Sequence, residues 1–319
     1  MRHLQYIVEW LLLGLACKSL ALMPWRAALA VGAALGSIAY RLGVRRRVVW
    51  ANLARAFPDW SDNERRRVAY ETYRNTGRTI IECLMLGSLS PSRLAELVEG
   101  VEGEEFIEQA GGVNKSFVVL TGHMGNWELM GAYFAQRGFR LKVFAKPMHN
   151  PRIESQLLAA RRAFGLDVLY TGEGLKPALR HLREGGALGF LADQDARRAG
   201  IAVPFFGVPA STALGPAVFA LLGKVPILPI FALRVGSAHH RFVALRPIEP
   251  RAGEKREVAL EQLTRAHVQA LEEMIRKHPE QYFWFHRRWK TPERKLKRGQ
   301  ARSAEKQNAA EDNRNSPGG

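Results

Sequence analysis

The chain has 319 residues, and 47% of them are hydrophobic, so it can form one large α/β domain with an appendage. Lysine and arginine (47) outnumber aspartate and glutamate (30), and the net charge of +17 predicts anionic partners: nucleic acid, anionic lipid, acidic proteins or phosphorylated substrates. The two cysteines, Cys17 and Cys83, lie far apart and suggest neither a disulfide framework nor a Cys-x-x-Cys metal site. A reducing, cytoplasm-facing location fits this cysteine content.

The chain begins with two apolar stretches that we expect to form helices hinged at Pro24. The first apolar run, residues 10–17, is bracketed by Glu9 and Lys18, and no cleavage site typical of a secreted protein follows it. The second run, residues 27–40, is shorter than the about 20 residues of a transmembrane helix. We therefore predict an interfacial membrane anchor, with a single N-terminal span as the alternative.

A basic helical segment follows these apolar stretches. It opens with three consecutive arginines at residues 45–47, and apolar positions in residues 48–57 recur at helical spacing. Ser61 and Glu64 have the spacing of a capping box, which predicts the start of a helix that continues to about Leu86.

From residue 100 onward, short apolar runs alternate with amphipathic stretches, apart from an irregular part that contains VPFFG at residues 203–207. This alternation predicts an α/β fold with a mixed, largely parallel sheet flanked by helices. We expect strands at residues 116–121, 140–145, 166–170, 187–192, 226–234 and 240–246, and helices at 126–137, 151–163, 174–184, about 211–222 and about 254–277.

These patterns divide the chain into four parts. We expect an apolar anchor over residues 1–43, a basic helical segment packed on the core over 44–99, an α/β domain over 100–292 and a basic, disordered tail over 293–319. Residues 282–290, near the end of the α/β domain, mix aromatic and cationic side chains, a combination typical of membrane interfaces.

The most informative motif is His123 followed five positions later by Glu128, between a predicted strand and a predicted helix. On one continuous helix the two side chains would diverge by roughly 140°. They can meet only if His123 lies in a turn, with Asn126 as the N-cap and Glu128 in the first helical turn. Backbone N–H groups at that helix start could then hold a developing oxyanion. Taken alone, this spacing is more often a surface turn.

A second acidic group follows another predicted strand. Asp193 comes directly after residues 187–192, as His123 follows residues 116–121. Because ligands of such sheets bind beyond the carboxyl ends of the strands, we expect both residues to face one cleft.

The motif GHMGNWE (residues 122–128) resembles the signature of the late acyltransferases of lipid A biosynthesis, the lauroyl and myristoyl transferases of the lysophospholipid-acyltransferase-like superfamily. The wider glycerolipid acyltransferases have His-x4-Asp, and this chain has glutamate at the last position, as the lipid A branch does. The resemblance covers most of residues 1–295. The chain lacks the FPEGTRS-like block of glycerol-3-phosphate acyltransferases, which argues against that branch of the superfamily. The other matching segments are residues 52–58, Asn150-Pro151 with Arg161, and residues 192–195, 203–207, 209–216 and 284–289.

This resemblance implies an O-acyltransferase in which His123 is the general base for the acceptor hydroxyl and Glu128 orients the imidazole. Arg161 would bind an acceptor phosphate or steady the site. The alternative interpretation is that Arg161 lies on a solvated helix face without a role in the site. Asp193 or Asp195 would position the acceptor or pair with Arg161; the alternative is a loop of solvated acids.

Asn126 belongs with the substrate-binding candidates, although its simplest role is the helix cap. No cofactor is implied, because a thioester supplies the energy of transfer. A metal site made of His123, His149 and Asp193 lacks the ligand spacing of known metal sites.

The resemblance also implies the partners. They are acyl-carrier protein as donor (acyl-CoA is possible), a phosphorylated glycolipid acceptor and an anionic membrane surface, on the cytoplasmic face of the inner membrane. An acyl-CoA-dependent enzyme acting on another glycolipid or phospholipid, such as a phosphatidylinositol mannoside, is the alternative. A basic nucleic-acid-binding protein would explain the charge but not the apolar N-terminus, and the chain has no nucleic-acid-binding signature, so we expect no nucleic acid partner.

Overall fold

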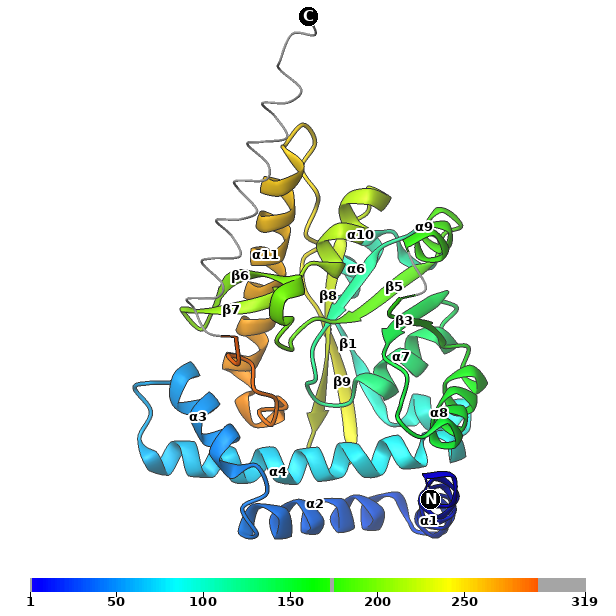
Figure 1. Cartoon of the computed structure of the whole chain (residues 1–319). Coiled ribbons are helices and arrows are strands. Elements are labelled where there is room, and N and C mark those ends of the chain that lie inside the picture. The colour runs from blue at the N-terminus through cyan, green and yellow to red at the C-terminus, as the bar shows by residue number, and fades with distance from the viewer. Residues whose placement is uncertain (1, 173–174, 292–319) are drawn as a thin grey trace, which may run out of the picture.

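The computed structural model describes residues 2–172 and 175–291, and a seven-stranded sheet lies at its centre (Figure 1). The strand order is β1-β9-β8-β2-β5-β3-β4, and neighbouring strands are parallel except for the antiparallel pair β8 and β9. The predicted mixed, largely parallel sheet is therefore confirmed. Its strands are β1 (Val98–Glu102), β2 (Val118–Thr121), β3 (Leu141–Ala145), β4 (Asp167–Tyr170), β5 (Ala187–Leu191), β8 (Ile227–Val235) and β9 (His239–Ala244).

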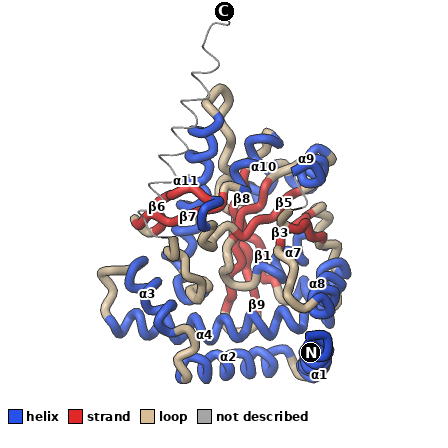
Figure 2. The backbone as a smooth tube through the Cα atoms, viewed as in Figure 1, coloured by secondary structure: helices blue, strands red, loops and turns tan. Residues whose placement is uncertain are grey.

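Helices cover both faces of this sheet (Figure 2). Because side chains of a strand alternate between faces, Val119 of β2 packs in one apolar cluster with α6 and α7, whereas Val118 and Leu120 pack in another with α9, α10 and α11. The helices of this region are α5 (Pro91–Glu96), α6 (Glu104–Ala110), α7 (Trp127–Gln136), α8 (Pro151–Ala163), α9 (Leu175–Arg183), α10 (Gly215–Gly223) and α11 (Arg256–Lys277). Short 3₁₀ helices lie at Leu86–Ser88, Gly112–Asn114, Arg197–Ala199 and Pro279–Gln281.

A hairpin occupies the stretch that the sequence analysis left irregular. Strands β6 (Gly200–Phe205) and β7 (Val208–Ala213) form a two-stranded antiparallel sheet beside α11. The helix expected from about residue 211 therefore starts later, at Gly215, because residues 211–213 pair with β6.

The N-terminal part forms four helices, α1 (Arg2–Ala21), α2 (Trp25–Arg41), α3 (Arg46–Ala56) and α4 (Asp62–Met85). Pro24 separates α1 from α2, and Ser61 and Glu64 form the predicted capping box at the start of α4. Helices α2 and α4 lie side by side, so close that a Cβ atom at Gly77 would lie 2.0 Å from the Gly32 carbonyl oxygen (Figure 1).

Helix α1 is the element that could anchor the chain in a membrane. Within residues 2–172 and 175–291, the helix His3–Ala21 is long and apolar enough to cross a bilayer, and only 6% of its apolar window is buried in the protein; α2 and α3, bent by 90°, pass the same test only when taken together. The predicted disordered tail, residues 293–319, lies outside the described residues.

Candidate active site

His123 and Asp193 meet at the carboxyl edge of the sheet. Strands β2 and β5 are parallel neighbours in which Thr121 pairs with Leu191, so the residues that follow each strand emerge side by side. The imidazole Nδ1 of His123 lies 2.8 Å from Asp193 Oδ1, and the backbone N–H of His123 donates to Asp193 Oδ2 at 3.0 Å. The two residues that follow these strands are therefore in direct contact.

This contact sets the protonation of the pair. Burial disfavours the charged form of His123, but the charge of Asp193, its hydrogen bond and the charge of Glu128 outweigh burial and raise the pKa of His123 above 6.5. Burial likewise opposes the Asp193 carboxylate, and the contacts with His123 outweigh it and lower the pKa of Asp193. With Nδ1–H donated to the carboxylate, Nε2 is the basic atom of a side chain that is 21% exposed.

The backbone of the turn is held from several sides. Gly125 has φ +56°, and a Cβ atom there would lie 2.1 Å from the Ala232 carbonyl oxygen, so glycine is required. The His123 carbonyl accepts from the Phe283 N–H at 2.8 Å. The rings of Trp127 and Phe283 lie 4.7 and 6.1 Å from the imidazole. The aromatic C-terminal segment is therefore part of the site.

Glu128 does not make the contact that the sequence analysis assigned to it. Its carboxylate binds Arg161 of α8 through two hydrogen bonds, 2.9 Å from Nε and 2.6 Å from Nη2. Asp193 contacts the imidazole because β5 lies next to β2 in the sheet. Glu128 lies in the first turn of α7, and its side chain contacts α8 instead. Asp193 therefore makes the contact with His123 that was predicted for Glu128. Glu128 in turn makes the contact with Arg161 that was predicted for Asp193 or Asp195.

The Glu128–Arg161 pair is expected to stabilise the fold. Burial lowers the pKa of Arg161, but the hydrogen bonds and charge of Glu128 outweigh this and raise it. Because both side chains are only about 10% exposed, Glu128→Gln should leave a buried guanidinium unpaired and lower the free energy of unfolding by about 3 kcal/mol. Denaturant unfolding would measure this change.

The matched control for Glu128→Gln is Glu104→Gln, which removes an exposed partner of Arg137. That change should lower the free energy of unfolding by less than about 1 kcal/mol. Equal losses in the two variants would mean that the Glu128–Arg161 pair contributes no more than a surface pair.

Asn126 is fully buried and caps α7, as the sequence predicted. Its Oδ1 accepts from the backbone N–H groups of Glu128 and Leu129 at 3.1 and 3.0 Å, and its Nδ2 donates to Glu82 at 2.8 Å. The two amides are therefore engaged with the cap and do not form the expected oxyanion site. Both ends of the Asn126 side chain are thus bonded within the protein.

Asp195 fastens the C-terminal segment to the loop after β5. Its carboxylate accepts from Thr291 N–H at 2.9 Å, from Thr291 Oγ1 at 2.8 Å and from Arg197 N–H at 2.8 Å. Its own N–H donates to His286 Nε2 at 3.1 Å. The predicted alternative of a pair between Asp195 and Arg161 is therefore wrong, because Asp195 binds Thr291 and Arg197 and Arg161 binds Glu128.

Sequence reasoning missed Glu82 and Arg234, which are bonded to each other directly behind the turn. Both interrupt apolar runs, Glu82 in IIECLM on α4 and Arg234 in ILPIFALRV on β8. A charged residue inside such a run could have indicated a buried ion pair, because charged side chains are almost never fully buried unless they are paired.

The sequence of the chain is similar to those of known proteins. A family model described as bacterial lipid A biosynthesis acyltransferase matches residues 1–291. The chain is 26% identical to the lipid A biosynthesis lauroyltransferase of Escherichia coli (strain K12) over 293 residues, which cover 91% of this chain and 93% of that protein. It is 25% identical to a lipid A biosynthesis acyltransferase of Haemophilus influenzae over 267 residues, 83% of this chain and 82% of that protein. A phosphatidylinositol mannoside acyltransferase of Mycobacterium tuberculosis is 26% identical over 158 residues, 48% of this chain and 50% of that protein.

Proposed function

This chain belongs to the bacterial lipid A biosynthesis acyltransferase family and is an O-acyltransferase, and on that premise we propose that it transfers a fatty acyl chain from acyl-carrier protein to a hydroxyl of a lipid A precursor. The observation that carries the mechanism is the 2.8 Å contact between His123 Nδ1 and Asp193, which leaves Nε2 available as a base.

In this mechanism Nε2 of His123 accepts the proton of the acceptor hydroxyl while its oxygen attacks the thioester carbonyl carbon. The C–O bond forms, the tetrahedral intermediate collapses, and the C–S bond breaks. The imidazolium then returns its proton to the leaving thiolate. Asp193 keeps the imidazole in the required tautomer and stabilises its charged form. Glu128 adds negative charge near the imidazole and holds Arg161, which steadies this side of the site.

The half-length match to a phosphatidylinositol mannoside acyltransferase supports a second candidate acceptor, with acyl-CoA as donor. Donor and acceptor can be crossed in one assay: labelled lauroyl- and myristoyl-carrier protein and the matching acyl-CoA, each with a tetra-acylated lipid A precursor or a phosphatidylinositol mannoside. We expect product from carrier protein and the lipid A precursor. Product only from acyl-CoA, or only on the mannoside, would contradict the first proposal and support the second.

The enzyme is proposed to work at the inner membrane, with its catalytic domain on the cytoplasmic face. Polar groups of α1 contact the catalytic domain: the Asn150 amide donates to Glu9 at 2.9 Å, and the Tyr6 hydroxyl lies 3.0 Å from His149 Nε2. By contrast, four leucines of α1 are more than half exposed: Leu4, Leu11, Leu12 and Leu15. An apolar surface of this kind supports insertion into lipid.

A basic cavity supports the proposed contact with anionic lipid. It has a volume of about 550 Å³ and is lined by Gly43, Arg45, Arg46, Arg47, Val48, Arg287 and Lys290. No acidic residue from the described part of the chain lines it, and exposed Leu42 and Val44 adjoin it in sequence. Such cations beside apolar side chains suit the headgroup region of an anionic leaflet.

The cavity gives a testable prediction. Since each cation near an anionic surface contributes about 1 kcal/mol, Arg46→Ser/Arg47→Ser should weaken binding to phosphatidylglycerol vesicles roughly 30-fold at low salt. Flotation with phosphatidylglycerol or phosphatidylcholine vesicles measures the effect. The control Arg265→Ser/Arg276→Ser removes two arginines of α11 that pair with Glu261 and Glu272. Equal weakening by both double variants would mean that net charge alone governs binding.

A further inference from the structure

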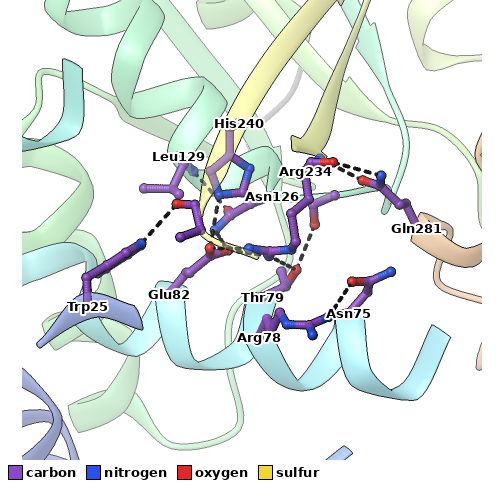
Figure 3. Close-up of polar contacts among 12 residues, drawn as sticks. Trp25, Asn75, Arg78, Thr79, Glu82, Asn126, Leu129, Arg234, His240 and Gln281 are labelled. Atoms are coloured by element: carbon purple, nitrogen blue, oxygen red, sulfur yellow. Dashed lines mark hydrogen bonds and ion pairs between the residues drawn. The ribbon is translucent and has the colours of Figure 1, made fainter. Parts of the chain in front are cut away.

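A buried polar cluster contacts the turn at Gly125 and Asn126, and Figure 3 shows its members around Glu82. At its centre is Glu82 of α4, whose side chain is 0% exposed. Both terminal nitrogens of Arg234, on β8, donate to its two oxygens, with Nη2 at 2.6 Å from Oε2. His240 of β9 lies 2.9 Å from Oε1 through Nε2. Side chains from the adjacent strands β8 and β9 thus meet the carboxylate of α4, a helix that is distant from them in sequence.

This cluster reaches the turn through two side chains. The Asn126 amide donates to Glu82 Oε2 at 2.8 Å, so the cap of α7 is itself fixed by the carboxylate. The Thr79 hydroxyl, one helical turn before Glu82, donates to the carbonyl oxygen of Gly125 at 3.0 Å and accepts from Arg234 at 3.2 Å.

Arg234 holds the turn from its other side as well. Its backbone N–H donates to Gln281 Oε1 at 2.7 Å, and its carbonyl accepts from Gln281 Nε2 at 3.1 Å. The carbonyl of Gln281 in turn accepts from the N–H of Gly125 at 3.0 Å. Both polar groups of Gly125 are therefore bonded to the Glu82–Arg234 pair through one residue each, and the Asn126 amide nitrogen is bonded to Glu82 directly.

Stability alone is a weak reason to bury this pair. Burial raises the pKa of Glu82, and the charge and hydrogen bonds of Arg234 and His240 outweigh this and lower it far below its ordinary value, so the carboxylate is ionised. Removing two charges from water is so unfavourable that well-packed apolar residues are often as stabilising as a buried ion pair. Charged groups with directional bonds do, however, fix one arrangement of the backbone around them.

We propose that Glu82, Arg234 and Thr79 are positioning residues, which hold the Gly125–Asn126 peptide and thereby set the place of His123 relative to Asp193. The proposal rests on the proposed function, since it assigns these residues to the acyl-transfer site. None of them touches the imidazole; they act through the backbone of the turn. A displacement of about 1 Å in such a site lowers a rate by as much as 10²-fold.

The decisive comparison is Thr79→Val with Thr72→Val. Both threonines are buried on α4, and both changes replace a hydroxyl by a methyl group without altering charge. Thr79 bonds the turn, whereas Thr72 bonds the Val68 carbonyl of its own helix. We expect Thr79→Val to lower kcat about 10- to 100-fold with KM for donor and acceptor within about threefold, and Thr72→Val to keep kcat within about twofold. Thermal unfolding of both variants verifies that each is folded at the assay temperature.

A second readout does not depend on acyl transfer. The imidazole of His123 can be titrated by NMR in histidine-labelled protein, with His123→Gln used to assign its signal. Looser contact with Asp193 should lower the pKa of His123 in Thr79→Val and leave it unchanged in Thr72→Val. Identical kcat and identical His123 titration in the two variants would overturn the positioning role. If the wild type transfers no acyl group to any acceptor, the proposed function fails, and the titration alone still decides this inference.

Discussion

His123→Gln is expected to lower kcat for acyl transfer by about 10²–10⁴-fold, because a general base contributes a factor of that size. A glutamine amide can still donate a hydrogen bond to Asp193, but it cannot accept the proton of the acceptor hydroxyl. Because the proposed proton transfer takes place in the transition state, the loss should fall on kcat, and KM should change little. Initial rates with labelled acyl-carrier protein and the lipid A precursor measure both constants.

His149→Gln is the control for this change. His149 lies beside Tyr6, with which its ring makes an edge contact at 5.4 Å, and we expect nearly wild-type turnover from this variant. Equal loss of activity in both variants would show that the effect is not specific to His123. Full activity of folded His123→Gln would remove His123 from the chemistry.

Asp193→Asn should lower kcat by about 10²–10⁴-fold while the protein remains folded. The carboxylate accepts from both Nδ1 and the backbone N–H of His123, and its charge stabilises the imidazolium formed during transfer. An asparagine removes that charge and can turn its amide toward the ring, which leaves Nε2 protonated and unable to act as the base.

Asp195→Asn is the same change two residues away. Its carbonyl oxygen can continue to accept from Arg197 and Thr291, so we expect kcat within about threefold of the wild type. Equal losses in the two variants would show that the loop after β5 matters as a whole and that Asp193 has no special role at the imidazole.

Much of the fold follows from patterns within single segments. The parallel strands around β2 and β5 and the helices that follow them were predicted to within a few residues, because apolar runs and helix caps are local signals. The β6–β7 hairpin was missed since its turn at residues 206–207 uses two positive φ angles, and one of them belongs to Phe206. Phenylalanine is not a typical turn residue, so Phe206-Gly207 does not match the Asn-Gly or Asp-Gly pattern of a two-residue hairpin turn.

The choice between two carboxylates could not be read from spacing. His123 and Glu128 are five residues apart, and that interval allows contact without requiring it. Asp193 reaches the imidazole because β5 pairs with β2, and strand order is a property of the whole sheet. The burial of Glu82 against Arg234 depends on the same tertiary arrangement, although each charge inside an apolar run was visible in the sequence.

The pH dependence of kcat/KM in the wild type and in Asp193→Asn tests the central claim most directly. The base must be neutral to act, so the rate should rise with pH through an apparent pKa above 6.5, where Asp193 and Glu128 outweigh burial of the imidazole. Without the Asp193 charge, burial should dominate and the residual activity of Asp193→Asn should rise through an apparent pKa shifted downward. The same apparent pKa in both proteins would contradict the assignment of His123 as a base held by Asp193.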